Sequence, residues 1–215
     1  MLKTIKFLGI CLIMLVCAGA LQTFAASSQK ETTTEYRENY LKILNLMRVE
    51  MNRAATTGDP SIDFLNEMIP HHEAAVSMSE NILKYGKNEK VKRIADRILN
   101  DQVKGIAKMK QLRNRLMMNP TIDKKAEAAY LKKYEDIFRK MVRAMEEAPA
   151  TENVDRDFLN EMIPHHEGAV AMAANILAYT KDPELKKIAE QIVESQGKQL
   201  EQMKKLRTAL SMKRI

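Results

Sequence analysis

The stretch Asp63-Phe64-Leu65-Asn66-Glu67-Met68-Ile69-Pro70-His71-His72-Glu73 occurs twice in this chain of 215 residues, the second time unchanged as residues 157–167. Around it, residues 36–118 align with residues 130–212 without a gap, at a constant shift of 94 positions. Outside the stretch, little more than a third of the aligned positions are identical. The chain therefore contains an internal repeat, and this block is its most constrained part, through either chemistry or packing.

The spacing of apolar residues predicts that each repeat folds into helices. From Tyr36 to Met51, apolar residues recur three and four positions apart, which is typical of one face of an amphipathic helix. The block opens a second helix, for which Ser61 or Asp63, or their equivalents in the second copy, are candidate N-caps. We expect six helices, at residues 36–53, 61–84, 89–116, 126–147, 155–178 and 184–210.

Composition and the repeat together predict an all-α fold. Only 7 Gly and 6 Pro are present, too few for the frequent turns of a many-stranded β architecture. The second and third helices of each repeat cannot bury their apolar faces alone, so these four should share the core of a four-helix bundle, with additional short helices packed on it. We expect one domain over residues 27–215, in which repeat one (36–118) and repeat two (130–212) are related by a pseudo-twofold axis.

Residues 1–26 have the features of a secretory signal peptide. Lys3 and Lys6 precede an apolar run, and small residues around Ala25 offer a cleavage point. An uncleaved membrane anchor is the alternative. The two cysteines of the chain, Cys11 and Cys17, lie in this segment, and neither follows the small residue that a lipoprotein signal carries. The mature chain is thus expected in the periplasm or outside the cell, without thiolates or disulfides.

The charge of the chain argues against a nucleic-acid partner. Removal of Lys3 and Lys6 lowers the formal net charge from +7 to +5, and the remaining basic residues alternate with acidic ones. Few aromatic residues are interleaved with them. We expect no nucleic acid and, after signal cleavage, no membrane as partner. Metal ions and an unidentified protein of the cell envelope remain as candidates.

The histidines of the chain all lie in the two blocks, as His71, His72, His165 and His166. On a helical wheel both imidazoles of a block flank the apolar stripe, so they should point into the bundle. Met68 lies one turn before His72, and Met78 two turns after His71 on nearly the same line. Met162 and Met172 hold the equivalent positions in the second copy.

Pro70 and Pro164 stand directly before the histidine pairs. Inside a helix, a proline removes one backbone donor and introduces a kink, at a cost of about 3 kcal/mol. A costly feature that is kept twice suggests a purpose. The alternative is that the helix begins at this point, with the proline as its first residue, where it costs little.

Methionine is the second unusual feature. Most methionines form repeat-equivalent pairs, namely Met47/Met141, Met51/Met145, Met68/Met162, Met78/Met172, Met109/Met203 and Met118/Met212. Methionine often only fills a core. Imidazole with thioether, in a chain without thiolate, is however the ligand set that suits copper, and Cu(I) more than Cu(II), although other transition metals that accept imidazole also fit.

The motifs of several metalloenzymes and other enzymes do not match. A zinc protease needs a second histidine four residues after the first, with glutamate beside the first, but Ala74, Ala75 and Val76 follow His72-Glu73. A di-iron oxidase needs Glu-x-x-His, whereas Glu67 precedes His71 by four residues. The mature chain also lacks a cysteine nucleophile, a glycine-rich phosphate loop and a Ser/His/Asp set.

The block with its following residues, Phe64-x-x-x-Met68-Ile69-Pro70-His71-His72-x-x-Ala75-x-x-Met78, closely resembles the signature of the bacterial family catalogued as domain of unknown function 305. The resemblance covers essentially the whole mature chain. It implies an exported protein with a ferritin-like four-helix bundle. Some members bind copper in the periplasm and contribute to copper resistance, so the resemblance also implies a role in metal tolerance.

The third helix carries both a further likeness and a departure. Gln102 with Met109, and Gln196 with Met203, resemble the Gln-x-x-Glu-x-x-x-Met pattern of the family. The expected Glu is Gly105 in the first copy and Gln199 in the second, and no Trp follows either methionine. A carboxylate-assisted site is therefore in doubt, whereas a site of histidine and methionine would survive the change.

The first hypothesis from the sequence is an exported protein that binds and sequesters copper without catalysis. Its ligands would be His71, His72, His165 and His166, with Met68, Met162, Met78, Met172, Met109 and Met203 completing softer sites. A second, methionine-only region could comprise Met47, Met51, Met141 and Met145. Acid should weaken binding at the histidines, with a loss visible by pH 5, because imidazole must be neutral to ligate.

Two other hypotheses stay open. One is a metal-free helical interaction module of the cell envelope, in which the histidines form hydrogen bonds across the bundle and the methionines fill its core. The other, with less support, is a redox enzyme such as a cuprous oxidase that uses the same ligands.

Overall fold

The computed structural model describes residues 8–212, which form six helices. For residues 8–28 it describes only the backbone. Over these residues the chain is all-α, as the sequence predicts, and contains no strand. The helices are α1 (Leu8–Asn52), α2 (Pro60–Tyr85), α3 (Glu89–Met118), α4 (Lys124–Glu146), α5 (Val154–Ile176) and α6 (Pro183–Met212).

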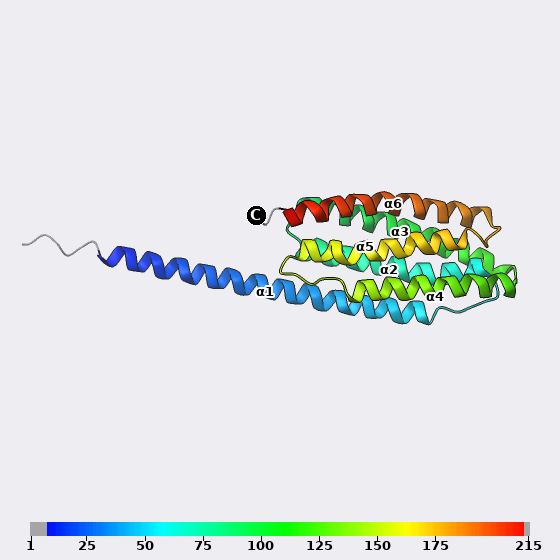
Figure 1. Cartoon of the computed structure of the whole chain (residues 1–215), viewed down its shortest axis with the longest axis horizontal. Helices are drawn as coiled ribbons and strands as arrows, with labels where there is room; N and C mark the ends of the chain where they lie inside the picture. Colours follow the sequence, from blue (N-terminus) through cyan, green and yellow to red (C-terminus); the bar gives the residue numbers. More distant parts are fainter. Residues whose placement is uncertain (1–7, 213–215) are drawn as a thin grey trace, which may run out of the picture.

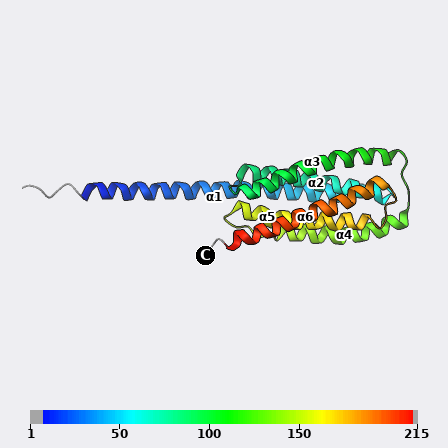
Figure 2. The same cartoon turned by 90° about the horizontal axis from the view of Figure 1, so that it is seen from above.

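The helices form three layers of two (Figure 1). Helices α2 and α5 lie in the middle, between the pair α1 and α4 and the pair α3 and α6. Turned by 90°, the molecule shows the first repeat, α1 to α3, beside the second, α4 to α6 (Figure 2). The bundle of α2, α3, α5 and α6 is therefore present, but the expected additional short helices form a full third layer. It consists of α4, with 23 residues, and the C-terminal part of α1, which has 45 residues in all.

Equivalent contacts recur in both repeats. The Asn81 side chain donates a hydrogen bond to the Tyr36 carbonyl at 3.0 Å, and Asn175 donates to the Tyr130 carbonyl at 3.1 Å. These bonds fasten α2 to α1 and α5 to α4. Contacts between the halves are reciprocal as well, because His71 and His165 each form a hydrogen bond with the backbone carbonyl of the other. An approximate twofold axis therefore relates the two halves, as the repeat predicts.

Helices α2 and α5 begin earlier than the block suggests. The N-caps are Asp59 and Asn153, not Ser61 or Asp63 or their equivalents. Asp63 instead accepts hydrogen bonds from the Thr57 backbone at 2.8 Å and hydroxyl at 2.7 Å, and so holds the preceding loop. Because α2 starts at Pro60, Pro70 lies inside the helix, and the alternative that it is the first helical residue is wrong.

The predicted signal peptide, residues 1–26, lies mostly beyond what the structure describes in detail. Residues 1–7 are outside the described part, and residues 8–26 are described only as the backbone of α1. This part of α1 extends past the end of the bundle in Figures 1 and 2. Among the described residues, no helix combines the length and the apolar character needed to cross a membrane.

Candidate metal centre

The two central helices meet at His71 of α2 and His165 of α5. Their ring centroids lie 3.7 Å apart, with an interplanar angle of 30°. Each ring is hydrogen-bonded through Nε2 to the backbone carbonyl of the other histidine, at 3.1 Å in both directions. A carbonyl oxygen can only accept, so each Nε2 carries the hydrogen and each Nδ1 keeps a free lone pair.

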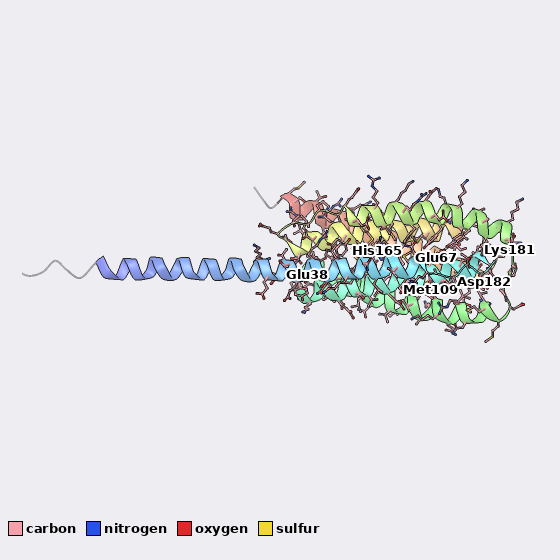
Figure 3. All side chains as sticks on the ribbon, turned by 90° about the horizontal axis from the view of Figure 1, so that it is seen from below. Glu38, Glu67, Met109, His165, Lys181 and Asp182 are labelled. Carbon is pink, nitrogen blue, oxygen red and sulfur yellow. The ribbon has the colours of Figure 1, made fainter. Side chains whose placement is uncertain are left out.

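His72 and His166 lie on either side of this pair, with ring centroids 6.0 Å from His71 and 5.9 Å from His165. The sequence left open whether the two blocks form one site or two, and the structure brings all four imidazoles into one histidine cluster. His72 is 3% exposed and the other three are 0% exposed. Figure 3 shows His165 among the side chains inside the bundle.

Each imidazole of the histidine cluster has a buried nitrogen without a hydrogen-bond partner in the described part of the chain. In all four residues this atom is Nδ1. The side-chain carbonyl oxygens of Gln102 and Gln196, which are also buried, lack a partner as well.

In His71, His165 and His166 the Nε2–H is donated to an oxygen, so the free Nδ1 is an acceptor. In His72 a backbone contact with Met68 opposes the fall in pKa, so its ring hydrogen is not assigned. Buried acceptors are usually satisfied, so this concentration of unsatisfied ones requires an explanation.

Burial keeps these histidines neutral. It lowers the pKa of His71 and His165 well below the usual range. It lowers the pKa of His72 to about 3, and that of His166 to about 4 against the opposing effect of a hydrogen bond to Gln199. The imidazoles are thus neutral at pH 5, so in this structure acidification to pH 5 should weaken binding through the histidines less than the sequence-based expectation holds.

The six methionines predicted to complete the site are all buried. The ion pairs Lys110–Glu73 (2.7 Å) and Lys204–Glu167 (2.6 Å) show which residues of the outer and central helices lie at the same level. Each pair joins the neighbour of a methionine, Met109 or Met203, to the neighbour of a histidine, His72 or His166. The outer-helix methionines thus lie level with the cluster.

Distance along the helix separates the remaining methionines. Met68 and Met162 lie one turn before His72 and His166. Met78 and Met172 lie seven residues beyond His71 and His165, about 10 Å further along the helix axis. Helix geometry therefore places Met68, Met109, Met162 and Met203 nearer to the level of the histidine cluster than Met78 and Met172.

The proposed methionine-only region lies in the outer layer of α1 and α4. Met47, Met51, Met141 and Met145 are all buried. Met141 packs directly on α5, since a Cβ atom at Gly168 would come within 2.7 Å of the Met141 Cγ. This tight contact fits a packing role for Met141.

Among residues 29–212, whose side chains the structure describes, no three of the types His, Cys, Asp or Glu converge as metal ligands would. The imidazoles alone thus do not form a ready coordination sphere. A metal bound here needs thioether or amide oxygen ligands beside the histidines, and Met109, Gln102 and Gln196 line one pocket together with His72.

The two ends of the histidine cluster differ. His166 Nε2–H donates a hydrogen bond to the Gln199 side-chain carbonyl oxygen at 2.8 Å, and the Gln199 amide donates to Asp101 at 3.0 Å. Gly105 holds the equivalent position beside His72, where a Cβ atom would lie 3.2 Å from the His72 Cδ2. The sequence already showed the difference between these residues, but not that each lies against an imidazole.

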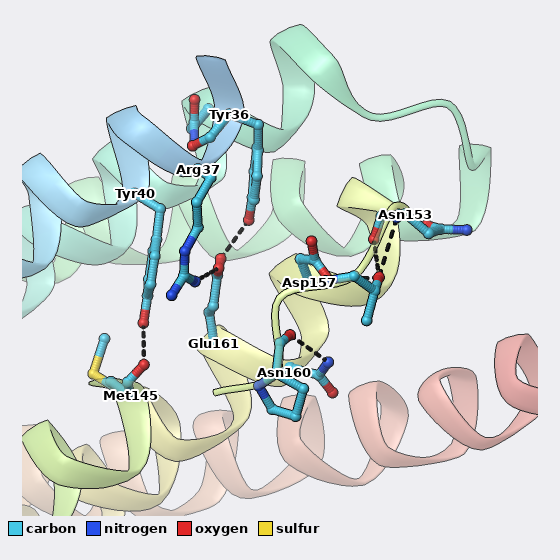
Figure 4. A network of polar contacts seen from close by, with 11 residues as sticks. Tyr36, Arg37, Tyr40, Met145, Asn153, Asp157, Asn160 and Glu161 are labelled. Atoms are coloured by element: carbon cyan, nitrogen blue, oxygen red, sulfur yellow. Dashed lines mark hydrogen bonds and ion pairs between the residues drawn. The ribbon is translucent and has the colours of Figure 1, made fainter. Parts of the chain in front are cut away.

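The other face of the central layer carries buried carboxyl groups that sequence analysis missed. Tyr36 donates a hydrogen bond to Glu161 at 2.5 Å, and Arg37 pairs with Glu161 at 3.1 Å (Figure 4). Tyr130 donates to Glu67 in the same way, but the equivalent of Arg37 is Leu131. The sequence contained one indication of these groups, because both glutamates belong to the block that recurs unchanged.

Burial raises the pKa of both carboxyl groups. The pKa of Glu67 is raised to about 9 and that of Glu161 to about 8, with the tyrosine hydrogen bonds acting in the opposite direction. On a helical wheel centred on Met68, Glu67 lies at the margin of the apolar stripe. It is nevertheless buried, because a central-layer helix has neighbours on both sides.

The fold and the site define a class of helical proteins whose repeats meet at a buried histidine cluster. The chain belongs to the family described as domain of unknown function (DUF305), whose model matches residues 22–113 and 61–207. The curated viral relative "Uncharacterized protein L153" of Acanthamoeba polyphaga mimivirus is 43% identical over 49 residues, which is 23% of this chain and 32% of that protein. The match thus spans about a third of that relative's length.

Several solved structures have a similar fold. CopM in the Cu(I)-bound form is 28% identical, with a TM-score of 0.54 over 70% of this chain and 96% of that chain. CopM in an Ag-bound form is 29% identical, with a TM-score of 0.53 over 69% and 95%. A DUF305 fragment from Deinococcus radiodurans is 26% identical, with a TM-score of 0.52 over 70% and 96%.

Proposed function

We propose that this protein is exported by residues 1–26, binds copper at the histidine cluster without catalytic turnover, and by sequestering it contributes to metal tolerance. The observation that carries the proposal is the set of four buried imidazole nitrogens without a partner. Each buried unsatisfied acceptor costs about 1–3 kcal/mol. A bound metal ion would use these lone pairs and remove that cost.

The orientation of the central histidines supports ligation. His71 and His165 each donate Nε2–H to a backbone carbonyl, which fixes the tautomer and the ring position. Histidines that bind metals commonly donate their other ring hydrogen to a carbonyl or carboxylate in this way. The Nδ1 atoms of these two residues are thus preorganised as neutral ligands.

The remaining ligands favour a soft ion. Thioethers are available at the level of the histidine cluster in Met68, Met109, Met162 and Met203, and this set suits Cu(I) more than Cu(II). The similar CopM structures include Cu(I)-bound, Cu(II)-bound and Ag-bound forms. Ag(I) has the same charge as Cu(I) and similar preferences, which makes it a useful probe here.

A metal-free helical module is the second candidate. It is favoured by the reciprocal hydrogen bonds of His71 and His165, which join α2 to α5 without any metal. It leaves the four Nδ1 atoms unexplained. The two candidates differ in one measurable property, namely whether the histidines contribute to metal affinity.

The experiment is a titration of residues 27–215 with Cu(I) under reductant, beside Ag(I), Cu(II) and Zn(II). The first comparison is with the quadruple His→Ala variant, after circular dichroism has shown that it folds. The second is with Met→Leu changes, which conserve volume and cost less than about 1.5 kcal/mol each. They are made at Met68, Met109, Met162 and Met203, with Met78 and Met172 as a matched control.

If copper binds through the histidine cluster, the quadruple His→Ala variant and the Met→Leu changes level with the cluster should both weaken Cu(I) binding. The Met→Leu changes at Met78 and Met172 should not. Loss in the methionine sets alone would move the site away from the histidines. Binding no tighter than a micromolar dissociation constant, about −8 kcal/mol, would favour the metal-free module. Export is checked separately, by the N-terminal sequence of the protein recovered outside the cytoplasm.

A further inference from the structure

A pocket opens between α3 and α6, the layer that no other described helix covers. Its volume is about 400 Å³. The buried residues that line it include His72, Gln102, Met109 and Gln196, while its charged residues are exposed. Figure 3 labels Met109 on the α3 side. Among the four imidazoles of the histidine cluster, the one that lines this pocket is thus His72.

Gly105 keeps this end of the cluster open. A Cβ atom here would lie 3.4 Å from the His72 Nε2, so a longer side chain would cover the ring. At the equivalent position Gln199 does cover His166, through its 2.8 Å hydrogen bond. In agreement, His72 is 3% exposed whereas His166 is 0% exposed.

The pocket carries a second sign of a ligand, independent of Gly105. Gln102 and Gln196 are each 2% exposed, and the side-chain oxygen of each has no hydrogen-bond partner in the described chain. These residues are repeat equivalents on α3 and α6, so they approach the pocket from opposite sides. Two such oxygens can transiently replace water around an incoming cation.

We infer that this pocket is the route by which a metal ion reaches the histidine cluster, with His72 as the first imidazole it meets. The inference rests on the proposed copper binding. His72 lies 6.0 Å from His71 between ring centroids, so an ion held at His72 is close to the central pair. At the other end Gln199, which also lines the pocket, lies between the pocket and His166.

The charges at the rim neither block nor direct a cation strongly. Three lysines, at positions 104, 108 and 198, face the carboxylates of Asp101 and Glu194. Lys198 pairs with Glu194 at 2.6 Å. The signs nearly balance, so access depends on the space beside His72 and on the neutral donors of the buried floor.

The kinetic test compares Gly105→Gln with Gly197→Gln. Both changes replace a glycine in an outer helix, but a Cβ atom at Gly197 meets nothing within 4 Å. Transfer of Cu(I) from a chromophoric chelator is followed by stopped-flow absorbance. Gly105→Gln should slow uptake at least about tenfold with unchanged stoichiometry, whereas Gly197→Gln should leave the rate unchanged. Equal rates in both variants would overturn the inference.

A second test needs no metal and therefore separates failure of the route from failure of copper binding. Diethyl pyrocarbonate modifies accessible neutral imidazoles, and peptide mass spectrometry locates the modified residue. In the metal-free protein His72 should react first, and Gly105→Gln should protect it. The reverse change, Gln199→Gly, should make His166 reactive.

The outcomes of the two tests are distinct. If His72 reacts first but no variant binds Cu(I), the opening exists and the proposed function is wrong. If Cu(I) binds but His166 reacts as fast as His72, or Gly105→Gln gives no protection, the route is wrong and the proposed function stands.

Discussion

Burial sets how the histidine cluster responds to acid. With folded-state pKa values of about 3 for His72 and about 4 for His166, roughly nine-tenths or more of these imidazoles are neutral at pH 5. Protons therefore compete for the ligands only below this pH. We predict that the Cu(I) dissociation constant changes less than about threefold between pH 7 and pH 5. Competition with a chelator of known pH dependence measures it, and a tenfold loss over this range would mean that the ligands are more exposed than described.

The buried carboxyl group of Glu67 gives a second pH prediction. Its folded pKa of about 9 lies above the ordinary value of 4.5, so the folded state binds a proton that the unfolded state has released at neutral pH. This contribution to stability is fully present below pH 4.5 and is lost as the pH rises toward 9. Glu67→Gln cannot lose a proton, so it should raise the free energy of unfolding at pH 8 by about 1–3 kcal/mol and change it little at pH 4.5.

Glu161→Gln is the matched control for this prediction. The Gln side chain would lose the ion pair with Arg37 that Glu161 makes at 3.1 Å, so its gain at pH 8 should be smaller. Urea unfolding of both variants at the two pH values gives the comparison. Equal gains in the two variants would show that Arg37 contributes nothing, and no gain for Glu67→Gln would show that Glu67 is ionised in the folded protein.

Residue identity and periodicity predicted that the histidines point into the bundle, but not which groups they form hydrogen bonds with. His71 and His165 are 94 residues apart, and their mutual hydrogen bonds depend on where α2 and α5 cross. A single helix carries no information about that crossing. The unsatisfied Nδ1 atoms follow from the same crossing, so they too were beyond sequence analysis.

At the scale of elements, the contact between α4 and α5 depends on a missing side chain. Alanine at position 168 would improve helix propensity by about 1 kcal/mol over glycine. The added Cβ atom would, however, meet Met141 at its Cγ within 2.7 Å. We predict that Gly168→Ala lowers the free energy of unfolding by about 1–3 kcal/mol, the range of overpacked cores. Thermal unfolding measures the sign.

The first repeat has an alanine at the equivalent position of α2. Ala74 holds this position in the first repeat and Met47 is the counterpart of Met141. Combining Gly168→Ala with Met141→Ala should relieve the contact and restore part of the lost stability, although the smaller side chain leaves a cavity. If Gly168→Ala alone is stabilising, α4 is not packed as closely on α5 as the structure shows.

The presence of the six helices was easier to predict than their bounds, since α1 begins at Leu8 and not at residue 36. The spacing of apolar residues located all six, because amphipathic periodicity is a local property. The N-cap of α2 was missed because Asp63 has the right residue type for a cap, and only the fold shows that it bonds Thr57 in the loop. Sequence analysis also missed that α1 and α4 form a third layer. This layer covers Glu67 and Glu161, and the polarity of these side chains argues against burial.

The whole molecule is organised around its central layer. The repeat predicted the approximate twofold axis, since equivalent helices must make equivalent contacts. It did not predict which face of α2 meets which layer. The histidine cluster meets the α3 and α6 side through His72 and Gly105, whereas Glu67 meets the α1 and α4 side through Tyr130.

This architecture makes the predicted single domain testable. The buried apolar residues of both repeats belong to one continuous core, in which α2 and α5 contact each other. We predict that residues 27–215 unfold in guanidinium in one transition, detected equally by circular dichroism and by tyrosine fluorescence.

The chain has 6 Tyr and 0 Trp, and Tyr36, Tyr40, Tyr130 and Tyr134 lie in α1 and α4. Their fluorescence therefore reports on the outer layer, whereas circular dichroism reports on all helices. An earlier tyrosine transition would show that α1 and α4 separate from a bundle that stays folded, and the single-domain prediction would then be wrong.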